Sequence, residues 1–420
     1  MRSLLLTQIV PNPPDAGPKA KTHYVLRTLA AEHDVDLITF ARSDLEVAQA
    51  EDLAPFCRSI TAIRLERQRP MELVYFAKSW ARRTPFLVER DARGAFAEAV
   101  RRQLATGAVD IVHADQLTMG QYLDLARGHH TRRVFDAHNA VWEMVRELAP
   151  RQKTPVHRAL AAVEWRRLRR FEGRIARESD LTLAVSERDR AALELAAGTT
   201  INAAIVPIGI EVHDRTVVTP SRSTNLLSIA TMHYPPNAEA LRWFLDEVWP
   251  LLGADRSEMT VDVAGPRPPE DIVAAGERDP RVRVHGYVED VEPLYQQAAV
   301  FIVPLLSGSG VRVKILEAMA RGVPVVSTTI GADGLDLDDG VHLLIADTPA
   351  AFADAVTYLL EHPERAQAMA VSGRERILER YDWRSCCRPL LDAYRQLSGD
   401  PAGETAGSMG FSIASARDVT

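Results

Sequence analysis

The residues best suited to chemistry lie between positions 305 and 335, in the sequence LLSGSGVRVKILEAMARGVPVVSTTIGADGL. A predicted strand ends just before this segment, a short loop contains Gly308 and Gly310, and the predicted helix that follows opens with Arg312 and Lys314. Glycines allow backbone N–H groups to approach a phosphate closely. The N-terminus of a helix adds roughly half a positive charge, and the two cationic side chains add full charges. The segment therefore predicts a site for a diphosphate.

Glu317 follows Lys314 by three residues, so both side chains are expected on one face of the helix. A carboxylate at this place can accept hydrogen bonds from two ribose hydroxyls, as the acidic residue of a dinucleotide site does. Together these residues suit a nucleoside diphosphate. The alternative is a surface ion pair between Lys314 and Glu317 beside an ordinary glycine turn, because short glycine loops are weak signals.

These residues must be positioned by strands that alternate with helices, a pattern that predicts parallel sheets. The fold class expected is α/β, with two Rossmann-like doubly wound domains that face a central cleft, where ligands bind beyond the carboxyl ends of the strands. The polar stretch TVVTPSRSTN is the best linker between them. The predicted divisions are a first domain over 1–212, a second over 213–380, a final helix over 381–397 that packs against either half, and a disordered tail over 398–420.

Composition agrees with this plan and excludes other classes. A chain of 420 residues is too long for one ordinary core, and a net charge of −7 argues against a nucleic-acid-binding protein. The longest apolar run has nine residues, whereas a membrane helix needs about twenty, and the N-terminus reads as a buried strand and not as a signal peptide. The three cysteines lack the spacing of a zinc site or a disulfide framework, which fits a reducing cytoplasm.

Segments spread over nearly the whole chain resemble the family 4 glycosyltransferases, which adopt the two-domain GT-B fold. In the first half these are VPNPPDAGPKAKTHYVLRTLA, DIVHAD, VFDAHNAVWEM, DLTLAVSERD and IVPIGIEV. In the second half they are ATMHYPPNAEALRWFLDEVWP, VDVAGP, VRVHGYVEDVEPLYQQAAVFIVPL, GSGVRVKILEAMARGVPVVSTTIGADGL and ERYDWRS. The resemblance implies transfer of a sugar from a nucleoside-diphosphate donor to a hydroxyl acceptor, with retention of configuration and without a metal or another cofactor.

The resemblance also assigns roles around the glycine loop. Glu317 matches the second acid of the family's paired-Glu motif, and the first acid is replaced by Ser309, which together with Gly308 and Gly310 is expected at the donor. Many members carry an Arg and a Lys after the first strand of the second domain, but residues 231–237 hold neither. We therefore expect Arg312 and Lys314 to replace them as the cations that bind the diphosphate.

Further site residues follow from the same resemblance. His138, at the end of the strand RVFDAH, resembles the active-site histidine that meets the transferred sugar, although a lone histidine there is more often structural. His113 and Asp115 end a neighbouring strand and are assigned to the acceptor side. Gly17, in the first loop, is expected beside the donor phosphates, with an ordinary turn as its alternative.

Three positions of the second domain complete the predicted donor site. Gly286 and Tyr287 resemble the segment that holds the nucleobase, where the Tyr either stacks on the base or belongs to the core. Asp333 stands near the donor sugar or phosphate by resemblance, and its alternative is a turn residue.

Other functions remain open from sequence alone. They are a nucleotide-sugar epimerase on the same fold, a non-catalytic nucleotide-sugar-binding subunit, and a nicotinamide oxidoreductase, which the missing G-x-G-x-x-G motif disfavours. The arginine-rich helix over 156–177 predicts either peripheral contact with a membrane or an ordinary amphipathic helix with a solvated basic face.

Overall fold

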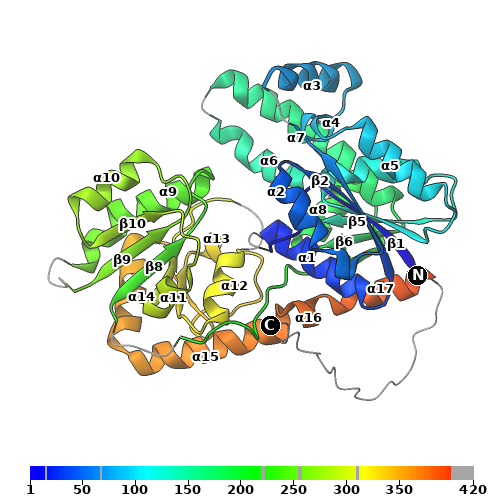
Figure 1. The fold of residues 1–420 in the computed structure, drawn as a ribbon. Helices are drawn as coiled ribbons and strands as arrows, with labels where there is room; N and C mark the ends of the chain where they lie inside the picture. Colours follow the sequence, from blue (N-terminus) through cyan, green and yellow to red (C-terminus); the bar gives the residue numbers. More distant parts are fainter. Residues whose placement is uncertain are drawn as a thin grey trace, which may run out of the picture.

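A computed structural model describes residues 1–14, 17–66, 69–152, 154–218, 223–253, 258–308 and 312–398. Two parallel sheets, of seven and six strands, form two domains that lie side by side (Figure 1). The predicted α/β class with two doubly wound domains is confirmed. The disorder predicted for 398–420 falls, apart from Ser398, outside the described residues.

In the first sheet the strand order reverses at β1, the third of its seven strands. Its strands, in spatial order, are β3 (Ser59–Arg64), β2 (Asp34–Ala41), β1 (Arg2–Thr7), β4 (Ile111–Asp115), β5 (Arg132–Ala137), β6 (Leu181–Ala184) and β7 (Ala203–Ile205). Its α-helices are α1 (Gly17–Ala30), α2 (Asp44–Glu51), α3 (Arg69–Arg82), α4 (Phe86–Arg90), α5 (Gly94–Leu104), α6 (Val141–Leu148), α7 (Pro155–Glu178) and α8 (Glu187–Ala197). The 3-10 segments are η1 (Ala54–Phe56), η2 (Leu117–Ala126) and η3 (Ala149–Arg151).

The second sheet repeats this plan around β8. Its strands, in spatial order, are β10 (Val282–Gly286), β9 (Thr260–Ala264), β8 (Asn225–Ile229), β11 (Val300–Val303), β12 (Val325–Ser327) and β13 (Leu344–Ile345). Its helices are α9 (Pro235–Trp243), α10 (Glu270–Arg278), α11 (Glu292–Gln297), α12 (Val313–Ala320), α13 (Thr329–Ala332), α14 (Pro349–Glu361) and α15 (Pro363–Arg380). Helix α9 is followed by a π turn, η4 (Phe244–Val248), and a 3-10 turn, η5 (Trp249–Leu252).

The central strands of both sheets are buried on both faces, which explains why they are continuous apolar runs. Leu4 and Leu6 of β1 face one core of the first domain, and Leu5 between them faces the other. Leu226 and Leu227 of β8 divide in the same way between the two cores of the second domain.

The end of the chain returns to the first domain. Figure 1 shows α15 passing beneath the second domain toward α16 (Trp383–Cys386) and α17 (Arg388–Ser398), which lie under the first. Trp383 stacks on Tyr24 of α1 at 5.2 Å between ring centroids, and Tyr394 is fully buried in the first domain's core.

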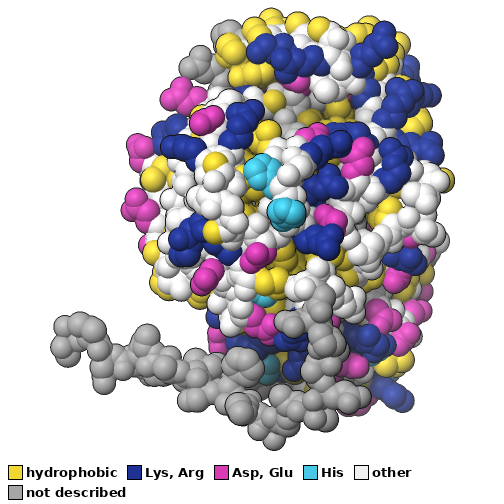
Figure 2. Space-filling model, turned by 90° about the vertical axis from the view of Figure 1, so that its right-hand side faces the viewer, with side chains coloured by type: hydrophobic (Ala, Val, Ile, Leu, Met, Phe, Trp, Pro, Cys, Tyr) yellow, Lys and Arg dark blue, Asp and Glu magenta, His cyan; other side chains and the backbone are white. Residues whose placement is uncertain are grey.

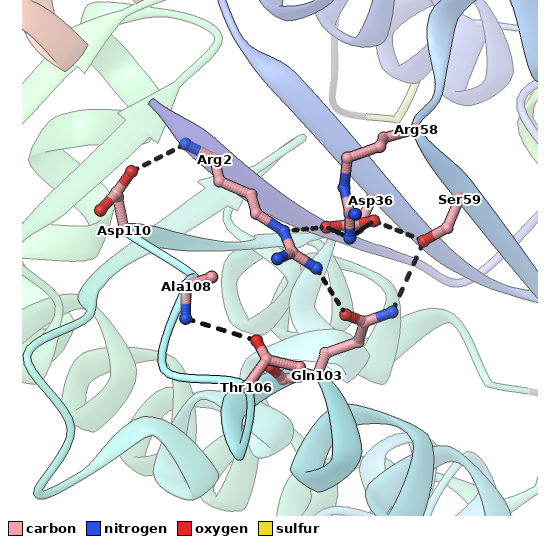
Figure 3. A network of polar contacts seen from close by, with 8 residues as sticks. All are labelled: Arg2, Asp36, Arg58, Ser59, Gln103, Thr106, Ala108 and Asp110. Atoms are coloured by element: carbon pink, nitrogen blue, oxygen red, sulfur yellow. Dashed lines mark hydrogen bonds and ion pairs between the residues drawn. The ribbon is translucent and has the colours of Figure 1, made fainter.

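A buried carboxylate closes the amino-terminal edge of the first sheet (Figure 3). Asp36 accepts hydrogen bonds from Arg2 Nε at 2.6 Å, from Arg58 Nη2 at 2.8 Å and from Ser59. Burial alone would raise the pKa of Asp36, but these hydrogen bonds hold it below its usual value. The network stabilises the edge opposite the one where ligands bind, because the carboxyl ends of all seven strands point the other way.

Candidate functional site

A cavity of about 340 Å³ lies where the two domains meet. Figure 1 shows α12 and α13 on the side of the second domain that faces α1. The cavity is lined from the first domain by Glu147, Leu148 and Arg188, and from the second by Leu306, Ser307, Gly308, Ile330 and Asp333. All five of these second-domain residues belong to the segment between positions 305 and 335 that the sequence singled out.

The glycine loop brings a guanidinium to this cavity. Gly308 has φ +110°, a conformation that favours glycine, and a Cβ added there would lie 3.2 Å from Arg312 Nη2 and 3.4 Å from Tyr234 Oη. Arg312 is only 8% exposed, so its charge is held inside the domain junction and not in bulk solvent. Ser309 and Gly310, both predicted at the donor, lie outside the described residues.

Lys314 contacts the loop over residues 231–237, which contains neither Arg nor Lys. Its Nζ donates a hydrogen bond to Asn237 Oδ1 at 3.0 Å, and Asn237 in turn donates to the Thr231 carbonyl at 2.9 Å. Burial, followed by the nearby charge of Arg312, lowers the pKa of Lys314 to about 7. A side chain on α12 thus supplies positive charge to the 231–237 loop, where the sequence provides neither Arg nor Lys.

Glu317 and Lys314 do not pair with each other in the described structure. Glu317 Oε1 accepts a hydrogen bond from Arg215 Nη2 at 3.0 Å, and Glu317 Oε2 accepts one from Arg321 Nη1 at 2.5 Å. Its carboxylate is therefore held by one cation from the interdomain connection and one from its own helix. The surface ion pair between Lys314 and Glu317, the alternative considered from sequence, is therefore not formed between these two described residues.

An ion-pair cluster crosses the cavity from one domain to the other. Arg188 of α8 pairs with Asp333 of the second domain, and its Nη2 lies 3.1 Å from Glu147 Oε1. Asp333 is thus not a plain turn residue, because its carboxylate binds the opposite domain. A ligand that enters the cavity meets these charges on both sides.

On the first domain, strand ends carry the histidine predicted at the active site. His138 Nε2 donates to Asp115 Oδ1 at 2.8 Å, and Thr22 of α1 donates to both oxygens of the same carboxylate at 3.0 Å. The other ring nitrogen, His138 Nδ1, is buried and has no hydrogen-bond partner in the described structure. Asp115 therefore orients the ring and leaves one nitrogen unused.

His113, predicted from sequence on the acceptor side, is enclosed by other side chains. It is fully buried, with Nδ1 2.6 Å from the Tyr394 hydroxyl of α17 and Nε2 3.4 Å from Asp136 Oδ2. Lys21 of α1 forms an ion pair with the other oxygen of Asp136. Burial alone would raise the pKa of Asp136, but the Lys21 ammonium and the neighbouring histidines hold it well below its usual range.

The ligand atoms of His113, Asp115 and Asp136 lie within 4.8 Å of one another, a spacing that could hold a metal ion. The surrounding residues fit a metal poorly, however. The Lys21 ammonium already neutralises Asp136, and a divalent cation beside it would be repelled. Thr22 and His138 donate to Asp115, so that carboxylate is also occupied.

The remaining predicted residues are Gly17, at the start of α1, and Gly286 and Tyr287, at the end of β10. Gly17 begins α1, and a Cβ added to it would lie 3.1 Å from Val313 Cγ2, so the first loop touches the start of α12. Gly286 ends β10 with φ +67°. The Tyr287 ring is largely exposed, which excludes the core alternative for that residue.

Sequence reasoning missed several residues of this region. Arg188 lies within the segment DLTLAVSERD, but nothing in that segment marks it as a site residue. Glu147 lies in a helix without a motif, and Lys21 is separated from Asp136 by 115 positions. The sequence offers one signal for Lys21. Its ammonium falls on the apolar face of the helix that begins at Gly17, between residues that should be buried.

Two family models match the chain. The model described as Glycosyltransferase Family 4 matches residues 22–214, and the model described as Glycosyl transferases group 1 matches residues 223–362. Together they span both domains and every described residue of the cavity lining.

Curated relatives match only in part. A stretch of 159 residues, 37% of this chain, is 32% identical to the D-inositol 3-phosphate glycosyltransferase of Corynebacterium urealyticum and covers 32% of that protein. A stretch of 165 residues, 38% of this chain, is 27% identical to an uncharacterised 44.6 kDa protein in the cps region of Klebsiella pneumoniae and covers 42% of it. The matches thus span less than half of either relative.

Solved structures match over nearly the whole chain. HepE from Anabaena, in complex with UDP and glucose, superposes with a TM-score of 0.68 over 94% of this chain and 100% of its own, at 13% identity. Sucrose-phosphate synthase from Thermosynechococcus elongatus gives a TM-score of 0.67 over 96% and 100%, at 18% identity. At such identities the likeness shows the fold, which is GT-B. With two matching family models and this fold, the chain belongs to the family 4 glycosyltransferases.

Proposed function

We propose that the protein transfers a sugar, a hexose, from a nucleoside-diphosphate donor to a hydroxyl acceptor, with retention of configuration and without a metal ion. The observation that carries the proposal is the position of Arg312 and Lys314 at the start of α12. Arg312, the residue just before α12, lies against Gly308 of the cavity lining. Lys314, the second residue of α12, donates a hydrogen bond to Asn237. Two cations in a partly closed junction are suited to a diphosphate.

Charge moves onto the leaving diphosphate as the bond between it and the anomeric carbon breaks. Arg312 and Lys314 would stabilise this growing charge, and donors that are preorganised in a water-poor site are most effective in such a role. The acceptor oxygen would bond to the anomeric carbon on the face that the phosphate leaves, and its proton would pass to the departing phosphate oxygen. No carboxylate is then needed as general base.

The first domain would supply the sugar contact. His138 presents a buried, unpartnered Nδ1, which can accept a hydrogen bond from a sugar hydroxyl because Asp115 holds the Nε2 proton. Closure of the domains across Arg188 and Asp333 would exclude water, the competing nucleophile.

Independence from metals is supported by Lys21. Its ammonium already neutralises Asp136 in the cluster of His113, Asp115 and Asp136, whose spacing could hold a metal ion. A cytoplasmic location is part of the proposal and is supported by three unpaired cysteines. The structural neighbour from Anabaena was solved with UDP and glucose, which makes a UDP-sugar the first donor to test. The acceptor is a glycan, a lipid-linked glycan or a small natural product.

The test is turnover of labelled nucleotide sugars in the presence of candidate acceptors. The proposal expects a glycosylated acceptor with the donor's anomeric configuration, at the same rate with and without a chelator. Interconversion of the donor sugar in the absence of acceptor would identify an epimerase instead. Binding of the donor without any turnover would favour a non-catalytic subunit, and a strict requirement for Mg²⁺ or Mn²⁺ would contradict the metal-free mechanism.

A further inference from the structure

Helix α3 of the first domain shows an unusual distribution of apolar residues. Five of the large hydrophobic side chains exposed in the structure lie on this one helix of 14 residues. They are Met71, Leu73, Val74, Phe76 and Trp80. Single exposed hydrophobic residues are ordinary on a protein surface, but a cluster of this kind marks a place of contact.

The apolar side of α3 faces away from the protein. Tyr75 and Ser79, four residues apart, form the inner side: Arg93 lies over the Tyr75 ring at 4.5 Å, and Ser79 Oγ accepts a hydrogen bond from Arg167 Nη1 of α7 at 3.3 Å. Leu73, Ala77 and Trp80 follow the spacing i, i+4, i+7 on the opposite side. Leu73 is 75% exposed. The Trp80 ring lies under Arg167 of α7 at 4.7 Å but stays 45% exposed. The helix therefore leaves much of its hydrophobic stripe, with Leu73 foremost, open to the outside.

Positive charge surrounds this stripe. Helices α3 and α7 together contain ten Lys and Arg residues and four Asp and Glu residues, in a chain whose net charge is −7. Lys78, Arg82 and Arg83 are exposed at α3 itself, and Arg158 is exposed in the first turn of α7. Figure 1 shows α3 and α7 together at one end of the first domain, and Figure 2 shows hydrophobic and basic side chains predominating at that end of the molecule.

The second half of α7 belongs to the core. Leu168 and Ile175 are buried in it, and Arg174 pairs with Asp124 and Glu178. The amphipathic-helix alternative considered from sequence thus describes this half.

On α3, Trp80 contacts Arg167 of α7 over part of its surface. Phe76 likewise contacts Phe86 of α4 over part of its surface. The first turns of α7 and the exposed surface of α3 around Leu73 belong to neither core of the first domain.

We propose that the outer side of α3, with the first turns of α7, docks on the surface of an anionic lipid bilayer. Leucine, valine and tryptophan side chains enter the interface between headgroups and acyl chains, and the adjacent basic side chains attract anionic headgroups. A second copy of this chain is a poorer occupant, because a two-fold interface would place the same basic residues opposite one another. In the described part of the chain no helix has the length and apolar character needed to span a bilayer, so the contact is peripheral.

The experiment measures binding of the full chain to vesicles, without donor or acceptor, so that its outcome is independent of the proposed activity. Vesicles of phosphatidylcholine are compared with vesicles that also contain phosphatidylglycerol. We expect binding to the anionic vesicles only, and weaker binding as salt is raised.

Leu73→Asp is the decisive variant, with Leu251→Asp as matched control, since Leu251 is an exposed leucine of the second domain at 56%. We expect Leu73→Asp to reduce the partition coefficient roughly tenfold or more, and Leu251→Asp to leave it unchanged. Both leucines are exposed, so the melting temperatures should match the wild type. Lys78→Glu, a second variant outside the apolar stripe, should weaken binding to anionic vesicles and make binding depend less steeply on lipid charge.

Three results would overturn the proposal. One is failure of the wild-type chain to bind anionic vesicles at low salt. Another is equal binding by Leu73→Asp and Leu251→Asp. The third is a wild-type dimer that Leu73→Asp dissociates without any vesicle binding, which would assign the surface to a second copy.

Discussion

Lys314 should take up a proton when the donor binds. Burial and the neighbouring Arg312 lower its pKa from 10.5 to about 7 in the unliganded protein, with the ammonium held by one hydrogen bond from Nζ to Asn237. A diphosphate that enters beside it favours the charged form and raises the pKa again. With a free pKa near 7, binding should take up about half a proton at pH 7 and about nine-tenths at pH 8.

The assay is calorimetric titration with a UDP-sugar in buffers of different ionisation enthalpy. A sugar nucleotide is preferable to the free diphosphate because its phosphates carry no terminal monoester group, which would titrate near pH 6. Affinity should be constant below pH 7 and fall by up to about tenfold per pH unit above it. Lys314→Met should bind more weakly and take up no proton through this site.

The lowered pKa of Lys314 also determines how the free energy of unfolding depends on pH. Between pH 7 and pH 10.5 the unfolded chain holds the lysine proton and the unliganded native chain does not, so this residue makes stability rise with pH over that window. Relative to Lys314→Met, the wild type should therefore gain melting temperature as the pH rises above 7. The difference between the two proteins should be largest below pH 7. Proton uptake of zero at pH 8, with affinity flat from pH 6 to 9, would refute the reasoning.

Three further outcomes are expected. Arg312→Ala should lower kcat/KM by about 10²- to 10³-fold while the melting temperature stays within a few degrees, and turnover within a few-fold of wild type would contradict the role of the guanidinium. Asp115→Asn should lower kcat by roughly 10- to 100-fold through misplacement of the His138 ring, with circular dichroism as the check on folding, and an unchanged kcat would remove the positioning role. Asp36→Asn should destabilise the fold by about 2–4 kcal/mol in urea titrations at pH 7, because it leaves Arg2 and Arg58 without their buried carboxylate, yet kcat should not change; loss of activity without loss of stability would argue against the separation of the two sheet edges.

The parts of the fold that were predictable from sequence are those whose burial is complete. β4 and β11 are buried on both faces, so their residues form apolar runs that are hard to mistake. β3 is only half-buried along its length and was not predicted. Helix α3 was also not predicted, although Leu73, Ala77 and Trp80 follow a helical spacing; that spacing cannot show that the stripe faces outward.

For the candidate site, the predictable part lies within one continuous segment. Gly308, Arg312 and Lys314 are close in sequence, and a turn followed by a helix is enough to bring them together. The partners of that segment come from elsewhere in the chain. Arg188 reaches Asp333 across 145 positions, and Arg215 reaches Glu317 across 102. The first pair depends on the packing of the two domains, and the second on the path of the connection between them.

The central claim is that the start of α12 holds a diphosphate at the junction of the two domains. A crystal structure of the protein with a nucleoside diphosphate tests it most directly. The account predicts that phosphate oxygens lie within hydrogen-bond distance of the Arg312 guanidinium and the Lys314 ammonium, with the Lys314 bond to Asn237 loosened or shared. Phosphates bound away from α12, with both side chains unmoved and unengaged, would contradict it.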